Sequence, residues 1–196
     1  LYFWRAIPQS TASSLSAKPE AANSAERAVR AAVERRKLPC RVVQHERVNT
    51  MFRLILDPPR STPKVAVVIP TRNAVSMVCR CIETLRAATN YPNYEIVVID
   101  NQSDDPRLAA YLGEASTRMP LRTFAHDRPF NHSDMHNQVI AELDAEWVVL
   151  VNNDVYDFTP GWLEQLVATV QLEPSIGGAG GKLFYPDGTI QHAGVI

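Results

Sequence analysis

Three short apolar runs constrain the fold of this chain more than any other feature of its sequence. The runs are Val65–Ile69, Glu95–Ile99 and Trp147–Val151. Continuous apolar runs of this length are typical of strands that are buried on both faces of a sheet. A shorter strand is expected at Leu121–Phe124, and segments with helical spacing separate all four. Strands that alternate with helices through short connections predict an α/β fold with a mostly parallel sheet and flanking helices.

The helices of this region are indicated by apolar residues that recur three or four positions apart. Such spacing predicts helices within 75–85, 108–115 and 135–143. Thr159 is expected to cap a fourth helix with Pro160 at its first position, where the missing backbone N–H of proline costs nothing. The Pro186-Asp187-Gly188 turn predicts a final antiparallel hairpin, formed by Lys182–Tyr185 and Thr189–Val195.

The first third of the chain has a different texture. Ser and Ala dominate residues 9–25, Ser24–Lys37 has helical spacing, and Arg41–Val48 and Met51–Leu56 predict a β-hairpin. The proline-rich segment 57–63 then interrupts all regular structure. The sequence therefore predicts three parts, which are a tail or linker, a small helix-plus-hairpin segment and the α/β domain, at residues 1–23, 24–62 and 63–196.

Charge and composition exclude several classes of partner. The 196 residues carry a net charge of −1, which provides no electrostatic reason to expect nucleic acid. No apolar run reaches the ~18 residues of a transmembrane helix. The three cysteines, Cys40, Cys79 and Cys81, lack metal-ligand spacing, which favours a reduced, cytoplasmic protein.

Polar residues follow three of the expected strands at the point where each strand ends. These are the segment 70–73, Asp100 and the segment Asn152-Asn153-Asp154. The carboxyl ends of parallel strands meet at one edge of a sheet, where ligands bind in open α/β folds. Asp100 can accept hydrogen bonds from a nucleobase or a ribose, and Asp154 can hold Mg²⁺ or Mn²⁺ that bridges two phosphates. Taken alone, Asn152–Asp154 is also good turn and helix-cap material, and by itself the segment favours that interpretation over a metal site.

The motifs that are missing narrow the chemistry. The chain has no G-x-G-x-x-G after its first parallel strand, no G-x-x-x-x-G-K-[ST] and no G-x-S-x-G. These absences argue against a dinucleotide site, a P-loop and a serine-hydrolase nucleophile elbow.

Five motifs occur in order along the second part of the chain. They are Val67–Asn73 (VVIPTRN), Ile99–Asp105 (IDNQSDD), Arg128–Ser133 (RPFNHS) with Asn137, Val151–Asp154 (VNND) and Tyr185–Gly194 (YPDGTIQHAG). Together they resemble the family 2 glycosyltransferases of GT-A fold, a Rossmann-like architecture, over about residues 63–196. Within that family the sequence is most similar to bacterial rhamnosyltransferase-like enzymes of O-antigen or surface polysaccharide synthesis.

The resemblance implies a nucleotide-diphospho-sugar donor and a divalent cation, Mg²⁺ or Mn²⁺, with Asp154 as the metal ligand. Asn152 departs from the acidic residue usual in the family's D-x-D motif, so metal affinity should be lower. Simpler interpretations of three residues stay open, because Arg128 could form a surface ion pair and Asn131 and Asn137 could be a helix cap and helix surface. The residues implied to bind the donor are Pro70, Thr71, Asn73, Asp100, Arg128, Asn131, Asn137 and Asn152.

The resemblance also implies inverting transfer to a glycan or lipid-linked glycan, in the cytoplasm and at the inner face of the membrane by peripheral association. The general base of the family lies downstream of Ile196, so we expect this chain to be an inactive fragment. Leu1–Arg5 resembles the closing segment of a preceding domain of the same family, which suggests a tandem parent. His192 lies in a segment frequent in the subgroup and receives no role.

Two other functions stay open. A nucleotidyltransferase shares the fold type and the need for a metal, but Pro70–Asn73 is not the Gly-rich basic loop that would hold a triphosphate. A non-catalytic interaction module that keeps the fold is compatible with Asn152 and with a missing base. Nucleotide binding discriminates between these functions, because an interaction module should show none.

Overall fold

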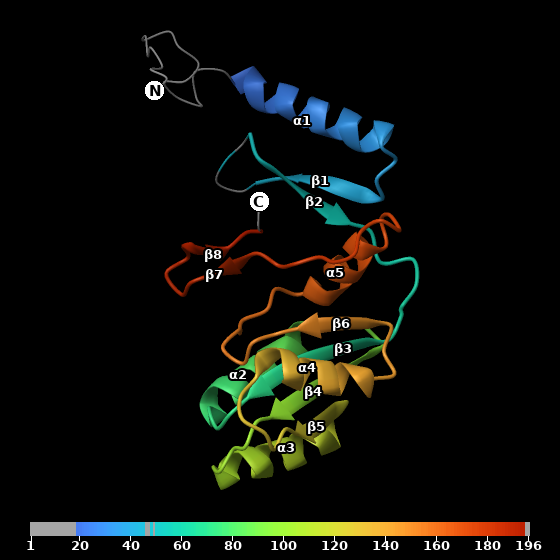
Figure 1. Cartoon of the computed structure of the whole chain (residues 1–196). Coiled ribbons are helices and arrows are strands. Elements are labelled where there is room, and N and C mark those ends of the chain that lie inside the picture. Colours follow the sequence, from blue (N-terminus) through green and yellow to red (C-terminus); the bar gives the residue numbers. More distant parts are fainter. Residues whose placement is uncertain (1–18, 46–47, 49, 195–196) are drawn as a thin grey trace, which may run out of the picture. The chain divides into compact units, whose positions relative to one another are not determined.

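The computed structural model describes residues 19–45, 48 and 50–194, and the chain divides into two compact units (Figure 1). The first unit comprises residues 1–58 and 168–177, and the second comprises residues 59–167 and 178–196. The predicted likeness of Leu1–Arg5 to the end of a preceding domain lies outside the described residues.

The first unit contains the predicted helix and β-hairpin. Helix α1 (Pro19–Arg35) starts five positions before the expected Ser24, because proline is tolerated in a first helical turn and the alanines after it favour helix. Strands β1 (Cys40–Gln44) and β2 (Phe52–Leu56) pair antiparallel. β1 ends at Gln44, earlier than expected, although the backbone N–H of His45 still donates across the hairpin to the Met51 carbonyl at 2.8 Å.

The second unit is built on a four-stranded sheet in which every pairing is parallel. The strand order is β5-β4-β3-β6, so β3 and β4, the first two strands of this sheet along the chain, occupy its centre (Figure 1). This arrangement confirms the predicted α/β fold with a mostly parallel sheet. The strands are β3 (Val65–Thr71), β4 (Tyr94–Asp100), β5 (Leu121–Ala125) and β6 (Trp147–Leu150).

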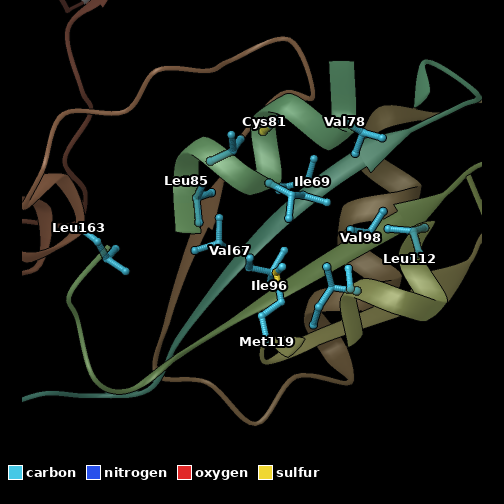
Figure 2. Packing of buried hydrophobic residues seen from close by; sticks show 14 of the residues in the cluster. Val67, Ile69, Val78, Cys81, Leu85, Ile96, Val98, Leu112, Met119 and Leu163 are labelled. Carbon is cyan, nitrogen blue, oxygen red and sulfur yellow. The ribbon is translucent and has the colours of Figure 1, made fainter. Parts of the chain in front are cut away.

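Alternate side chains of the two central strands enter two separate apolar clusters. Val67 and Ile69 of β3 lie with Ile96 and Val98 of β4 in the larger cluster, which Figure 2 shows. The residues between them enter the smaller cluster on the opposite face. Helices α2 (Val75–Ala88) and α3 (Pro106–Arg118) contribute to the larger cluster, and α4 (His132–Ala141) contributes to the smaller one.

The fourth helix of this region begins later than the sequence predicts. Helix α5 is Trp162–Val170, and the expected start at Thr159-Pro160 is wrong. Gly161 has a φ of +77°, a left-handed conformation that interrupts a right-handed helix, so Thr159–Gly161 forms a turn before α5. None of the described helices is long and apolar enough to cross a bilayer.

The predicted C-terminal hairpin is present but short. β7 (Leu183–Phe184) pairs antiparallel with β8 (Ile190–His192). The turn closes where the backbone N–H of Gly188, at a φ of +83°, donates to the Tyr185 carbonyl. His192 is exposed on β8 opposite Leu183.

The packing of α2 predicts a contrast between two substitutions on this one helix. Ile82 is fully buried in the larger cluster, whereas Met77 is 48% exposed. Ile82→Ala should lower the free energy of unfolding by about 2–5 kcal/mol, since it removes buried methyl groups and leaves a cavity. Met77→Ala should change it by less than about 0.5 kcal/mol. Urea unfolding of both variants tests this, and equal losses would contradict the burial of this helix face.

Candidate functional site

The carboxyl ends of the four parallel strands meet at one edge of the sheet, and hydrogen bonds join the loops that follow them. Residues of the β3 loop bond to the β4 loop, the β4 loop bonds to the β5 loop, and the β6 loop bonds back to the end of β3. Three polar segments that the sequence placed at strand ends therefore belong to one connected structure.

Asn73 joins the loop after β3 to the loop after β4. Its backbone N–H donates to Ser103 Oγ at 2.7 Å. Its Oδ1 accepts from the backbone N–H groups of Asp104 and Asp105 at 3.0 and 3.1 Å. Asn73 has a φ of 55°, a left-handed conformation that asparagine tolerates better than most residues. The side-chain oxygen of Asn73 is therefore occupied in holding two loops together.

Asp100 lies at the end of β4 and is half-buried. Its Oδ1 accepts from the backbone N–H of Ser103 at 3.1 Å, which fixes the direction of the carboxylate. The second carboxylate oxygen has no hydrogen bond to another described residue. Asp100 can therefore accept a donor group from a ligand without giving up the bond that orients it.

Asn101 is a central residue of the site to which the sequence assigned no role. It is 2% exposed, and its backbone N–H donates to the Thr71 carbonyl at 2.9 Å. Its Nδ2 donates to the carbonyl oxygens of His126 and Arg128 at 3.0 and 2.9 Å. The only signal for it in the sequence is a polar residue directly after a buried strand. Asn101 thus determines where the loop after β5 begins.

Two buried polar atoms near this junction lack hydrogen-bond partners among the described residues. One is Asn101 Oδ1 and the other is His126 Nε2. His126 Nδ1 lies 3.2 Å from Gln138 Oε1, and Nε2 is 3.8 Å from an Asp134 carboxylate oxygen. Buried groups without partners are rare in proteins, and they mark this junction as polar space next to the site.

The loop after β5 leads to α4, where the structure places the other predicted donor-binding residues. Arg128 is exposed, and its Nη1 lies 3.6 Å from Asp134 Oδ2. Asn131 caps α4, since its Oδ1 accepts from the Asp134 backbone N–H at 3.0 Å. Asn137 is exposed further along α4. The first two side chains thus have partners within the protein, and a contact of any of the three with a donor stays a prediction.

In the segment after β6, the side-chain amide of Asn153 faces the protein and the side chains on either side of it are exposed. Asn153 is half-buried, and its Nδ2 donates to Thr71 Oγ1 at 3.0 Å. Thr71 is itself 4% exposed, so it holds Asn153 from the interior of the protein. Asn152 and Asp154 are exposed on either side of Asn153. Pro70, which precedes Thr71, is half-buried and lies opposite Ile99 in the sheet.

The negative charge of Asp154 is close enough to α2 to affect the buried thiol of Cys81. Burial and, to a smaller extent, the Asp154 carboxylate raise the pKa of the Cys81 thiol to about 12. The Cys81 Sγ–H also donates to the Asn152 carbonyl at 3.8 Å. The described residues contain no group of three His, Cys, Asp or Glu that could hold a metal by themselves. A single exposed carboxylate nevertheless fits Mg²⁺ or Mn²⁺, which commonly take one or two protein carboxylates and complete their shell with substrate phosphates and water.

Comparison with known proteins gives a consistent family assignment. The family model described as Glycosyl transferase family 2 matches residues 66–192. The uncharacterized protein y4gI of Sinorhizobium fredii is 38% identical over 198 residues, with 100% of this chain and 22% of the relative covered. The O-antigen biosynthesis protein RfbC of Myxococcus xanthus is 34% identical over 140 residues, with 71% of this chain and 11% of the relative covered. The chain therefore spans less than a quarter of the length of these relatives.

Solved structures agree on the fold. The mannosyltransferase PcManGT from Pyrobaculum calidifontis, solved in complex with GDP-Man and Mn²⁺, matches with a TM-score of 0.55 at 20% identity, covering 81% of this chain and 43% of that one. Residues 1–349 of S. aureus TarS match with a TM-score of 0.51 at 20% identity, covering 61% of this chain and 38% of that one. At this level of identity the likeness extends to the fold alone.

The bonds of Asn101 predict a measurable cost when its side chain is removed. Asn101→Ala removes the donor to the carbonyl oxygens of His126 and Arg128 and leaves a buried cavity. It should therefore lower the free energy of unfolding by roughly 1–3 kcal/mol. Hydrogen exchange in residues 126–131 should rise in the same variant. The control is Asp104→Ala, whose exposed side chain makes no such bond and whose substitution should alter neither quantity. Unchanged exchange in Asn101→Ala would contradict its role as the link between these loops.

Proposed function

The chain belongs to glycosyl transferase family 2, and on that premise we propose that the strand-end site binds a nucleotide-diphospho-sugar together with Mg²⁺ or Mn²⁺. The intact protein would transfer the sugar to a glycan or lipid-linked glycan during synthesis of a bacterial surface polysaccharide. The name of the Myxococcus xanthus relative, an O-antigen biosynthesis protein, supports this acceptor class. The resemblance of the motifs to rhamnosyltransferase-like enzymes makes rhamnose one candidate for the transferred sugar.

The observation that carries the proposal is the position of Thr71 between the two acidic groups of the site. Thr71 pairs with Asp100 in the parallel register of β3 and β4. Its Oγ1 accepts the hydrogen bond of Asn153, which lies between Asn152 and Asp154. One buried residue therefore ties both the expected base-binding carboxylate and the expected metal ligand to the same edge of the sheet.

Each group at this edge has a distinct chemical task in the proposal. The free oxygen of Asp100 would accept a hydrogen bond from the nucleobase or ribose, while Ser103 keeps the carboxylate in place. Asn152, which carries no charge, would bond the ribose, and Asp154 would bind the cation. When bound, the cation would neutralise charge on the leaving diphosphate.

The proposed transfer is a single displacement that inverts the anomeric centre. An acceptor hydroxyl oxygen forms the new bond to the anomeric carbon as the bond to the diphosphate oxygen breaks. A general base must take the hydroxyl proton in that step, and we assign this role to none of the described residues. The proposal for this chain is therefore limited to donor binding.

One observation favours a second function, a non-catalytic module that keeps the fold. The segment Asn152–Asp154 contains a single carboxylate, which provides less charge for a cation than two would. Such a module would bind neither metal nor nucleotide at this edge. The same measurement separates the two functions.

Calorimetric titration of UDP, GDP and dTDP into the 196-residue chain, with Mn²⁺ and then with EDTA, tests donor binding. We expect one of the three to bind in a Mn²⁺-dependent manner, and EDTA to reduce its affinity. Asp154→Asn should weaken binding in Mn²⁺ by roughly tenfold or more, because even residues that only support a metal ligand contribute that much to metal affinity. Asp154→Asn should leave binding in EDTA unchanged.

Two matched variants make this result specific. Asp100→Asn should weaken binding both with and without Mn²⁺, since Asp100 is assigned to the nucleoside rather than to the metal. Asp144→Asn removes a fully exposed carboxylate that precedes β6 at the other end of the strand, and it should have no effect. Absence of binding for all three nucleotides in the folded chain would favour the non-catalytic module.

A further inference from the structure

Side chains on one face of helix α2 contact the loop that carries Asp154. The Cζ atom of Arg80 lies 3.6 Å from the centroid of the Tyr156 ring. The Nη2 group of the same arginine donates to Asp157 Oδ2 at 2.8 Å. Arg80 therefore makes a cation–π contact and a charged hydrogen bond with two neighbouring residues of the loop.

Thr84, one helical turn after Arg80, secures the backbone of the same loop. Its Oγ1 accepts from the Asp157 backbone N–H at 3.1 Å and donates to the Arg80 carbonyl at 2.8 Å. Asp157 has a φ of 56°, a conformation that costs free energy in a residue other than glycine and persists only where surrounding contacts hold it. Arg80 and Thr84 provide such contacts, one to the side chain and the other to the backbone.

The two ends of the loop are thus held by different elements, and Asp154 lies between them. Asn153 is tied to Thr71 at the end of β3, and Asp157 is tied to α2. Asp154 itself is exposed and accepts no hydrogen bond from another described residue. The position of its carboxylate therefore depends on the anchors to either side of it.

We propose that Arg80 is a positioning residue for cation binding at Asp154. Its contacts with Tyr156 and Asp157 hold the backbone of residues 152–157, and this backbone sets the direction in which the Asp154 carboxylate faces the diphosphate. Arg80 acts through the loop rather than on the ligand. The inference rests on the proposed function, because it names a residue on which the binding of the metal and diphosphate depends.

The geometry of Arg80 separates this role from that of an ordinary surface charge. An isolated exposed ion pair contributes little, because solvent screens it and two long side chains must be ordered. A guanidinium whose Cζ lies over a ring while one of its N–H groups bonds a carboxylate is restrained by both contacts. Lysine retains the charge and loses the planar fork, so Arg80→Lys tests whether the geometry matters.

Hydrogen exchange without any ligand tests the anchor itself. Arg80→Ala should increase exchange of amides in residues 152–157 by about threefold to thirtyfold, the combined effect expected for an exposed cation–π contact and an ion pair. Arg80→Lys should restore only part of the protection. The control is Arg86→Ala on the same helix, where the side chain is exposed and makes no hydrogen bond or ion pair with this loop.

Nucleotide binding then tests positioning. Arg80→Ala should weaken Mn²⁺-dependent binding of the tightest of UDP, GDP and dTDP by about the same factor. It should weaken binding in EDTA by a smaller factor, because Asn152 of the same loop is proposed to bond the ribose. A loss of equal size in Mn²⁺ and EDTA, or unchanged hydrogen exchange, would overturn the positioning role. If exchange rises as expected while the unsubstituted chain binds no nucleotide, the anchor stands and the proposed function fails.

Discussion

Burial of the apolar residues of β3 and β4 on both faces of the sheet is the constraint on which the rest of the second unit depends. Residues 65–69 and 96–99 are fully buried and alternate between two apolar clusters. A polar side chain along these strands would need a buried partner, because an unpaired one costs several times the net value of a hydrogen bond. Polar chemistry is therefore confined to the strand ends, and a parallel sheet brings those ends to one edge.

At that edge the positions of the loops are set by hydrogen bonds to buried polar groups rather than by apolar packing. Thr71 and Asn101 are almost fully buried, and between them they contact the loops after β4, β5 and β6. These bonds connect segments that are far apart in the sequence. Asp100 is held by one oxygen and Asp154 by its neighbours, so the groups proposed to bind the donor are placed by residues that need not touch it.

Helix α2 likewise combines apolar packing on one face with polar contacts to the site on another. Its inner face contributes Ile82 and Leu85 to the core, while Arg80 and Thr84 on another face hold the loop after β6. One helix thereby contributes to stability and to the geometry of the site. Changes to the first set should affect unfolding, and changes to the second should affect the order of the loop.

The sequence was enough to predict the α/β class, the four parallel strands and the edge at which Asp100 and Asp154 lie, because burial on both faces requires continuous apolar runs that are visible in the chain. It did not determine the start of α5, which depends on the left-handed conformation of Gly161. It also did not reveal the roles of Asn101 and Arg80. Their partners lie 25 to 77 positions away, and no local pattern in the chain indicates which distant loops come within reach of their side chains.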